Sequence, residues 1–326
     1  MDFTDSQLGE ALGRKFVDRT FGAEGKQRTL DMVHASEKAL SEVIDEAAWM
    51  TPATRKEAQI KLKAVTNKIG YPDKWRDYSS VVIKRDDAVG NSSRADEFEF
   101  QRQLNKIGKP PDPTEWSMSP PTVNAYYDPQ MNNINFPAGI LQPPFYDKQS
   151  DDAVNFGGIA TVIGHELTHG FDDQGRQFDA QGNLRDWWTP GDAKAFDEHA
   201  ACIDEQYSKF SPVPGVYLNG KLTLGENVAD NGGVRVALTA LLNTIGTGNQ
   251  KTVDGFTPEQ RFFLSFGQIW CENQREESLR LRALTDPHSP GRYRVIGVVQ
   301  NMPEFQKAFS CKPSQAMVRA NACRVW

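Results

Sequence analysis

Residues 162–173 read VIGHELTHGFDD, and this stretch decides how the rest of the chain is interpreted. His165 and His169 lie four positions apart, so on an α-helix both imidazoles are on one face and can point at the same ion. Glu166 lies about 100° around the helix, close enough to reach a water molecule on that ion. A pair of neutral imidazoles suits zinc better than calcium or magnesium. The stretch predicts a zinc site; the alternative is a helix with two surface histidines and a chance glutamate.

A third zinc ligand is offered by residues 225–233, which read GENVADNGG. Glu226 and Asp230 are also four apart, so they share one face of a second predicted helix. Glu226 would complete a His-His-Glu set, and Asp230, one turn further along, could accept the other ring N–H of a ligand histidine. The alternative is a solvated acidic face. Gly225 at the start and Gly232-Gly233, interpreted as the end of that helix, favour tight packing instead.

Composition limits the classes of protein to which the chain can belong. Its 326 residues allow one large domain or two ordinary ones, and a net charge of −6 gives no basic surface for nucleic acid or anionic membranes. The chain contains no run of about 18 apolar residues, so the sequence predicts no membrane span. The first residues lack the profile of a signal peptide, so we expect either a cytosolic protein or a piece whose leader lies elsewhere.

The local patterns predict a helix-rich α+β fold. Residues 28–49 have helical spacing, and Thr51 with Pro52 predicts the start of another helix. Residues 123–141 predict a β-hairpin, whereas residues 84–113 are charged and then proline-rich and indicate a boundary or an exposed connection. Further helices are predicted at residues 157–171, 190–210, 222–243 and from Pro258. The tail, residues 286–311, combines a short strand-like apolar run with a final helix.

Five motifs in order, NAYY…FPAGILQPPF, VIGHELTHGFDD, GENVADNGG, HSPGRYRVIG and CRVW, resemble the neprilysin family of zinc endopeptidases, which includes endothelin-converting enzyme. The resemblance implies a zincin-like (thermolysin-like) catalytic domain at residues 116–326. Residues 1–115 would then be a remnant of the helical lid region, because family members are usually about twice as long as this chain.

The resemblance also implies a role for each site residue. One Zn²⁺ would be bound by His165, His169 and Glu226. Glu166 would be the general base, Asp230 would orient the first zinc histidine, and His288 would stabilise the oxyanion. The substrate main chain would be held by Asn124, by the backbone of Ala125 and by Arg294. Either Asp172 or Asp173 would hold His288 protonated. Hydrophobic positions near the pocket beyond the cut bond, with simple core packing as the alternative, would be Ile140, Phe145, Val162 and Trp270.

These residues predict a zinc-dependent endopeptidase acting on oligopeptides, and the resemblance implies that it cleaves on the amino side of hydrophobic residues. One alternative is a peptide-binding scaffold that has lost turnover with its lid, and another is an aminopeptidase, for which the chain has no additional acidic motif. The expected partners are oligopeptides and either a missing N-terminal half or a second copy of the chain. The family acts outside the cytoplasm, which implies a secreted or periplasmic location.

Four cysteines, Cys202, Cys271, Cys311 and Cys323, form no C-x-x-C pair, so a thiolate zinc site is disfavoured. Spacing alone leaves disulfides and free thiols open. The family resemblance implies a Cys202–Cys323 disulfide, with Cys271 and Cys311 either free or bonded to each other.

Overall fold

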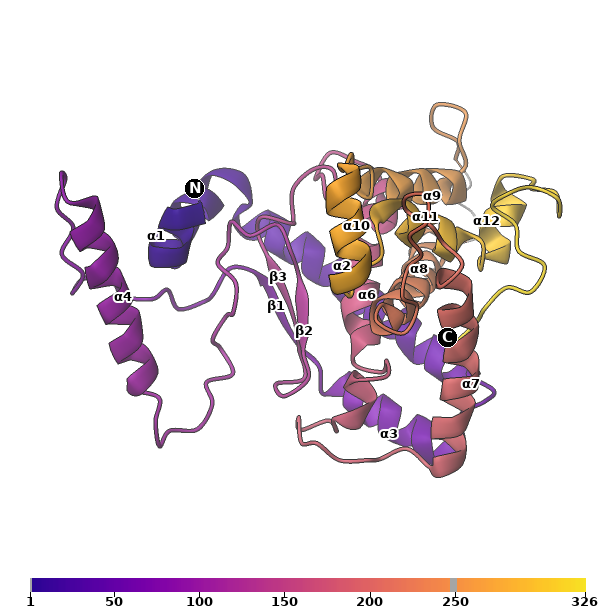
Figure 1. Ribbon diagram of the computed structural model, residues 1–326, viewed down its shortest axis with the longest axis horizontal. Coiled ribbons are helices and arrows are strands. Elements are labelled where there is room, and N and C mark those ends of the chain that lie inside the picture. The colour runs from indigo at the N-terminus through magenta and orange to yellow at the C-terminus, as the bar shows by residue number, and fades with distance from the viewer. Residues whose placement is uncertain (1, 247–250) are drawn as a thin grey trace. The chain divides into compact units, whose positions relative to one another are not determined.

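The computed structural model describes residues 2–246 and 251–326 (Figure 1). It divides into two compact units. Unit 1 comprises Met1–Thr29, Lys68–Ala125 and Asn135–Gln142, and unit 2 comprises Leu30–Asn67, Tyr126–Ile134 and Pro143–Trp326. The chain passes from one unit to the other within α2 and within strands β1 and β3. The predicted division at residues 115 and 116 stays a prediction.

Unit 1 contains α1 (Asp2–Thr20) and α4 (Ala88–Leu104), which pack against each other. The prediction of a boundary or an exposed connection at residues 84–113 missed helix α4, although Ala95 is the one buried residue of that helix. Asp87 explains the difference, because its side chain caps the helix by accepting the amide of Gly90 at 3.0 Å. Arg102 then pairs with Glu99 at 2.7 Å, so charges that suggested an open connection stabilise a helix.

Unit 2 holds most of the helices, and its apolar core lies between them. The predicted start of α3 is confirmed: Thr51 caps it and Pro52 is its first residue. The helices predicted from residues 157, 190, 222 and 258 are also present, the first preceded by a π-helical turn at Phe156–Ala160. The helices that lie wholly or mainly in unit 2 are α2 (Gly22–Glu46), α3 (Pro52–Lys63), α5 (Asp152–Asn155), α6 (Thr161–His169), α7 (Pro190–Tyr207), α8 (Leu224–Ile245), α9 (Pro258–Ile269), α10 (Glu276–Thr285), α11 (Gly291–Val299) and α12 (Pro303–Ala308).

The three-stranded sheet has the order β1-β3-β2, with β1 at Thr66–Gly70, β2 at Tyr126–Asp128 and β3 at Asn133–Pro137. Strands β2 and β3 are neighbours joined by a short turn, so the predicted hairpin is confirmed. Asn132 in that turn has a φ of 45°, a backbone conformation that asparagine tolerates better than most residues. The prediction of a helix-rich α+β fold is confirmed.

The prediction of a strand-like run near the C-terminus is wrong, because these residues form helix α11. Its valines and isoleucine favour strands by local propensity alone. As a helix, however, the segment buries Tyr293, Arg294, Gly297 and Val298 together, and packing of one face overrides the local preference. Gly297 allows this packing, because a Cβ there would lie 2.4 Å from the ring of Tyr207.

Helices α6 and α8 lie side by side, and glycines set the distance between them (Figure 1). A Cβ on Gly233 would lie 2.5 Å from the amide nitrogen of His165 and 2.8 Å from the carbonyl oxygen of Thr161. A Cβ on Gly164 would lie 2.5 Å from the carbonyl oxygen of Gly233. The interpretation of Gly232-Gly233 as a helix end is wrong, since α8 continues to Ile245. The tight packing inferred there is present.

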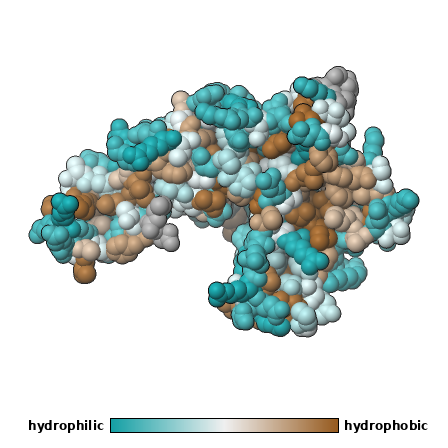
Figure 2. All heavy atoms as spheres, turned by 90° about the horizontal axis from the view of Figure 1, so that it is seen from above, coloured by the Kyte–Doolittle hydropathy of each residue, from teal (hydrophilic) through white to brown (hydrophobic). Residues whose placement is uncertain are grey.

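On the face drawn in Figure 2, hydrophobic side chains lie among hydrophilic ones. Exposed hydrophobic residues of unit 2 include Leu264 on α9 and Leu281 and Leu284 on α10. No helix in the described part of the chain is both long enough and apolar enough to cross a bilayer.

A disulfide joins Cys202 on α7 to Cys323 near the C-terminus, so the predicted pairing is confirmed. Cys271 and Cys311 are free, the first of them exposed. The bridge anchors a segment whose final residue, Trp326, is buried against Trp49 and Phe171.

Replacing both bridged cysteines with serine should lower the free energy of unfolding by about 2–5 kcal/mol, because the bridge spans 121 residues of sequence and restricts the unfolded chain. Urea denaturation of the oxidised protein measures the change. Cys271→Ser is the control and should stay within about 0.5 kcal/mol of the wild type, since that side chain is exposed. Equal stability of the double variant and the wild type would contradict the stabilising role of the bridge.

Candidate metal centre

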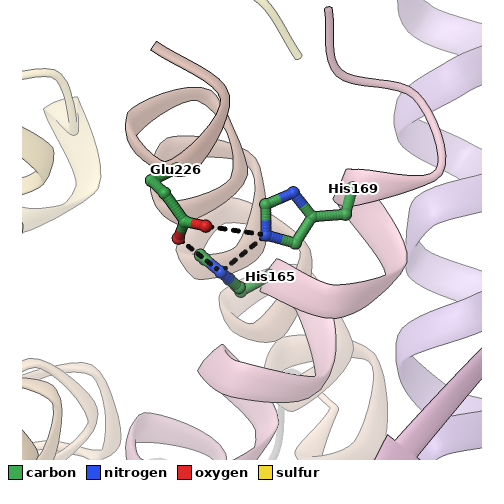
Figure 3. Close-up of side chains that lie close together, drawn as sticks. All are labelled: His165, His169 and Glu226. Atoms are coloured by element: carbon green, nitrogen blue, oxygen red, sulfur yellow. Dashed lines mark hydrogen bonds and ion pairs between the residues drawn. The ribbon is translucent and has the colours of Figure 1, made fainter. Parts of the chain in front are cut away.

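Three side chains from two helices converge in unit 2 (Figure 3). His165 and His169 project from α6, with their Nε2 atoms 3.0 Å apart, and Glu226 projects from the first turn of α8. Its Oε2 lies 3.2 Å from Nε2 of His165, and its Oε1 lies 3.6 Å from Nε2 of His169. One ligand atom from each residue falls within 4.8 Å of the others. Two imidazoles and a carboxylate therefore meet at one point.

The arrangement fits zinc. Oε2 of Glu226 is buried and makes no hydrogen bond among the described residues, although a buried carboxylate oxygen ordinarily has a partner. Both histidines turn the same nitrogen, Nε2, toward the carboxylate of Glu226. Two histidines and one glutamate form a donor set of catalytic zinc sites, in which three protein ligands leave a fourth position open.

Each histidine is held from behind by an aspartate. Nδ1 of His165 lies 2.8 Å from Oδ1 of Asp230, and Nδ1 of His169 lies 2.6 Å from Oδ2 of Asp172. A carboxylate on Nδ1 keeps the proton there and leaves Nε2 as the free nitrogen. The contact of Asp230 with the first histidine is the one expected from the sequence. That of Asp172 was missed, although its position three residues after His169, just beyond the helix end, could have indicated it.

Arg294 on α11 lies behind the cluster and is only 7% exposed. Its Nε and Nη2 donate to the two carboxylate oxygens of Asp230 at 2.7 and 2.6 Å, and its guanidinium lies 4.0 Å above the ring of Trp270. Burial raises the pKa of Asp230, but the charge of Arg294 and the hydrogen bond from His165 outweigh it and hold that pKa below its ordinary value. Asp230 is therefore an anion that can orient His165.

Glu166 is 5% exposed and follows the first histidine on α6. Burial raises the pKa of its carboxyl group, against the opposing charges of His165 and His169. A carboxylate whose pKa is raised is a better proton acceptor than one in water. Its surroundings therefore favour a role as a base over a role as a further ion-pair partner.

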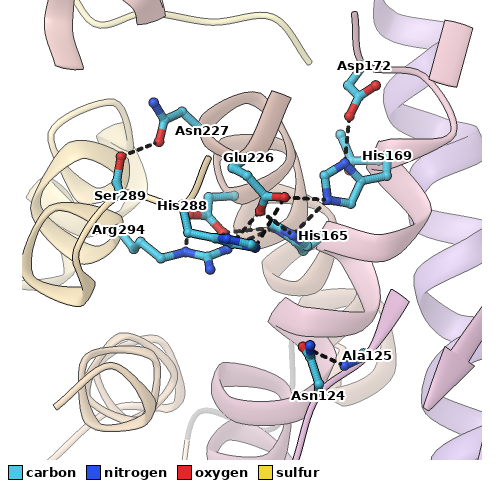
Figure 4. Close-up of polar contacts among 12 residues, drawn as sticks. Asn124, Ala125, His165, His169, Asp172, Glu226, Asn227, His288, Ser289 and Arg294 are labelled. Carbon is cyan, nitrogen blue, oxygen red and sulfur yellow. Dashed lines mark hydrogen bonds and ion pairs between the residues drawn. The ribbon is translucent and has the colours of Figure 1, made fainter. Parts of the chain in front are cut away.

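His288 reaches the cluster from the segment before α11, and about half of its side chain remains exposed (Figure 4). Its Nε2 lies 3.3 Å from Oε1 of Glu226, and its Nδ1 lies 2.9 Å from Oδ1 of Asp286. The neighbouring Ser289 donates to Asn227 at 2.8 Å, which attaches this segment to α8. The expectation that an aspartate of residues 172–173 pairs with His288 is wrong. Asp286 does so, two residues earlier in the same turn.

The remaining predicted site residues lie elsewhere. Asn124 and Ala125 directly precede β2 in unit 1, and the side-chain oxygen of Asn124 accepts the amide of Ala125 at 2.9 Å (Figure 4). Ile140 is buried in unit 1, whereas the other three apolar positions are partly exposed in unit 2: Phe145, Val162 and Trp270. Their roles in substrate binding stay predictions.

Known proteins share both the sequence and the fold. A family model described as Peptidase family M13 matches residues 124–325, and an N-terminal model of the same family matches residues 1–72. Endothelin-converting enzyme 1 of Homo sapiens is 44% identical over 336 residues, which cover 99% of this chain and 43% of that protein. Neprilysin of Homo sapiens is 39% identical over 338 residues, covering 100% of this chain and 45% of neprilysin. The chain thus spans less than half the length of these relatives.

Solved structures give the same result. The zinc metalloprotease Zmp1 of Mycobacterium tuberculosis, solved with an inhibitor, superposes with a TM-score of 0.93 at 43% identity, over 99% of this chain and 50% of that one. PepO from Lactobacillus rhamnosis superposes with a TM-score of 0.85 at 35% identity, over 97% of this chain and 49% of that one. Because the family model from residue 124 to 325 covers more than half of the sequence, the chain belongs to peptidase family M13.

Proposed function

We propose that this chain is a zinc-dependent endopeptidase acting on oligopeptides. The observation that carries the proposal is the convergence of His165, His169 and Glu226, with Glu166 buried beside the first histidine. Zinc, when bound by these residues, supplies a Lewis acid and lowers the pKa of its water to about 7. The relatives named above include a zinc metalloprotease, which supports the choice of metal.

Each side chain has one task in the proposed reaction. Glu166 takes the proton of the attacking water and passes it to the leaving amine. His288, kept near Glu226 by its contact with Asp286, donates a hydrogen bond to the oxyanion that forms on the peptide carbonyl. Arg294 uses Nε and Nη2 on Asp230, so Nη1 is the nitrogen that we assign to a substrate carbonyl. Asn124 and the backbone of Ala125 bind the substrate main chain.

We assign a preference for cleavage before hydrophobic residues. The partly exposed side chains of Phe145, Val162 and Trp270 support this preference, since they offer apolar surface that a buried core would not. In this proposal residues 116–326 carry the catalytic functions, and residues 1–115 belong to a helical lid region. The Cys202–Cys323 bridge supports work in an oxidising compartment outside the cytoplasm.

Zinc removal and return tests the proposal. The metal-free chain should not hydrolyse an internally quenched peptide containing one Phe or Leu, and one equivalent of zinc should restore cleavage on the amino side of that residue, as mass spectrometry of the products would show. The same peptide with Asp at that position is the control and should be cut far more slowly. Binding of peptide and zinc without cleavage would instead support the peptide-binding scaffold.

A further inference from the structure

Lys61 on α3 is the one lysine that is buried in the described part of the chain, with 1% of its surface exposed. Its ammonium group donates to three carbonyl oxygens, those of Gly170 at 2.6 Å, Gly175 at 2.7 Å and Phe178 at 2.8 Å. An ammonium has three N–H donors, so all of them are used here. A neutral amine would have only two and would place its lone pair against the third oxygen.

Such a group is costly to bury. Burial lowers the pKa of Lys61 to about 7, against the opposing charges of Asp172 and Asp179. No ion pair of Lys61 with a carboxylate is found in the described part of the chain. Nζ is surrounded by the three carbonyls and by the rings of Phe171, Tyr127 and Trp187, whose centroids are 5.5, 5.7 and 6.0 Å away. The three hydrogen bonds to carbonyl oxygens are therefore what compensates this ammonium for the water that it loses on burial.

The three acceptors belong to one turn, residues 170–178, which directly follows α6 and contains Asp172. Gly170 is the residue after His169, and the amide of Gly175 donates to Oδ1 of Asp172 at 2.7 Å. The other oxygen of Asp172 contacts Nδ1 of His169. Lys61 therefore donates hydrogen bonds to this turn both before and after Asp172, the aspartate that orients His169 of the metal centre.

Helix α3 does not depend on Lys61 for its attachment to unit 2. At its first turn, the hydroxyls of Thr51 and Thr54 donate to Oδ2 of Asp192 at 2.7 and 2.5 Å. Lys61 extends from the opposite end of this anchored helix, so the helix supplies a fixed base from which one side chain can hold the turn.

We propose that Lys61 is a positioning residue for zinc: it fixes the turn at residues 170–178, so that Asp172 holds His169 with Nε2 toward the other two ligands. The inference rests on the zinc site of the proposed function. It extends that site to a residue more than 100 positions earlier in the chain, as the separation of 109 residues between Lys61 and Gly170 shows.

A double-mutant cycle on zinc affinity tests the inference. Lys61→Met and Asp172→Asn should each raise the zinc dissociation constant about 10–100-fold, the usual effect of losing support behind a metal ligand. Both changes break the same connection, so their effects should not add. The zinc dissociation constant of the double variant should be within a few-fold of that of the single variant that binds zinc more weakly. Chelator competition measures the constants, and Lys63→Met, exposed on the same helix, is the matched control with wild-type affinity.

The inference would be overturned if the fold-change in the zinc dissociation constant of the double variant equalled the product of the two single fold-changes. That result would mean that Lys61→Met acts independently of Asp172, as a general loss of stability would. If wild-type protein binds no zinc, the proposed function fails first and the inference with it. A second measurement needs no variant. Reciprocity requires zinc binding to strengthen the hold of Lys61 on the turn, so hydrogen exchange at its ammonium, followed by NMR of ¹⁵N-lysine-labelled protein, should slow about tenfold or more when zinc is added. An unchanged rate would also overturn the inference.

Discussion

Replacing Glu166 with glutamine should leave zinc bound and lower kcat by about 10²–10⁴-fold, the usual contribution of a positioned general base. Glutamine has the same shape as glutamate but cannot accept a proton from water at neutral pH. The three ligand residues are untouched, so zinc content should match the wild type. The fold should tolerate the change, because burial penalises a charged carboxylate at this position and a neutral amide avoids that penalty.

Steady-state hydrolysis of the quenched peptide and metal analysis of the same sample measure both effects. Glu198→Gln serves as the control, since Glu198 is an exposed residue of α7 paired only loosely with Lys194 at 3.7 Å. Wild-type turnover in a zinc-loaded Glu166→Gln protein would remove Glu166 as the base. Loss of zinc together with turnover would show that Glu166 supports the ligands instead.

Gly233→Ala should weaken zinc binding and the fold together. The new methyl group would lie 2.5 and 2.8 Å from the amide nitrogen and Cα of His165, and these backbone atoms cannot rotate away. Helices α6 and α8 must separate, which moves Glu226 away from the two histidines. Overpacking of this kind costs about 1–3 kcal/mol of the free energy of unfolding. If that whole cost falls on zinc binding, the zinc dissociation constant should rise by about 5–150-fold.

Gly267→Ala is the matched control, because a Cβ at Gly267 on α9 would meet no atom within 4 Å. Relief of glycine's entropy cost in a helix should stabilise that variant by about 0.5–1 kcal/mol. Urea denaturation and chelator competition give both quantities. If Gly233→Ala matched Gly267→Ala in stability and in zinc affinity, the contact between α6 and α8 would not set the geometry of the site.

The sequence predicted the set of metal-ligand side chains because helical spacing is a local property. His165 and His169 are four apart on one helix, and Glu226 and Asp230 are four apart on another. That these two helices meet depends on Gly164 and Gly233, whose contact is not local. The family resemblance supplied the pairing of Cys202 with Cys323, which spacing alone had left open.

The hydrogen-bond partners of the histidines were predicted less accurately than the metal ligands. They depend on the conformations of the loops that follow or precede the helices. Asp172 lies beyond the end of α6 and reaches back to His169 through a tight turn. Its position three residues after His169 is compatible with this contact, but only the conformation of the turn selects Asp172 over Asp173. Asp286 was missed in the same way, although it is only two residues from His288. In α11 the β-branched residues favoured a strand, and only burial of one face against the rest of unit 2 makes that segment a helix.

The exposed thiol of Cys271 gives experimenters a natural labelling position. It follows Trp270 directly, and the ring of Trp270 supports the guanidinium of Arg294. Cys202 and Cys323 are protected from maleimides by their bridge, and Cys311 is partly buried. A fluorophore attached to Cys271 would therefore report zinc and peptide occupancy without an engineered cysteine.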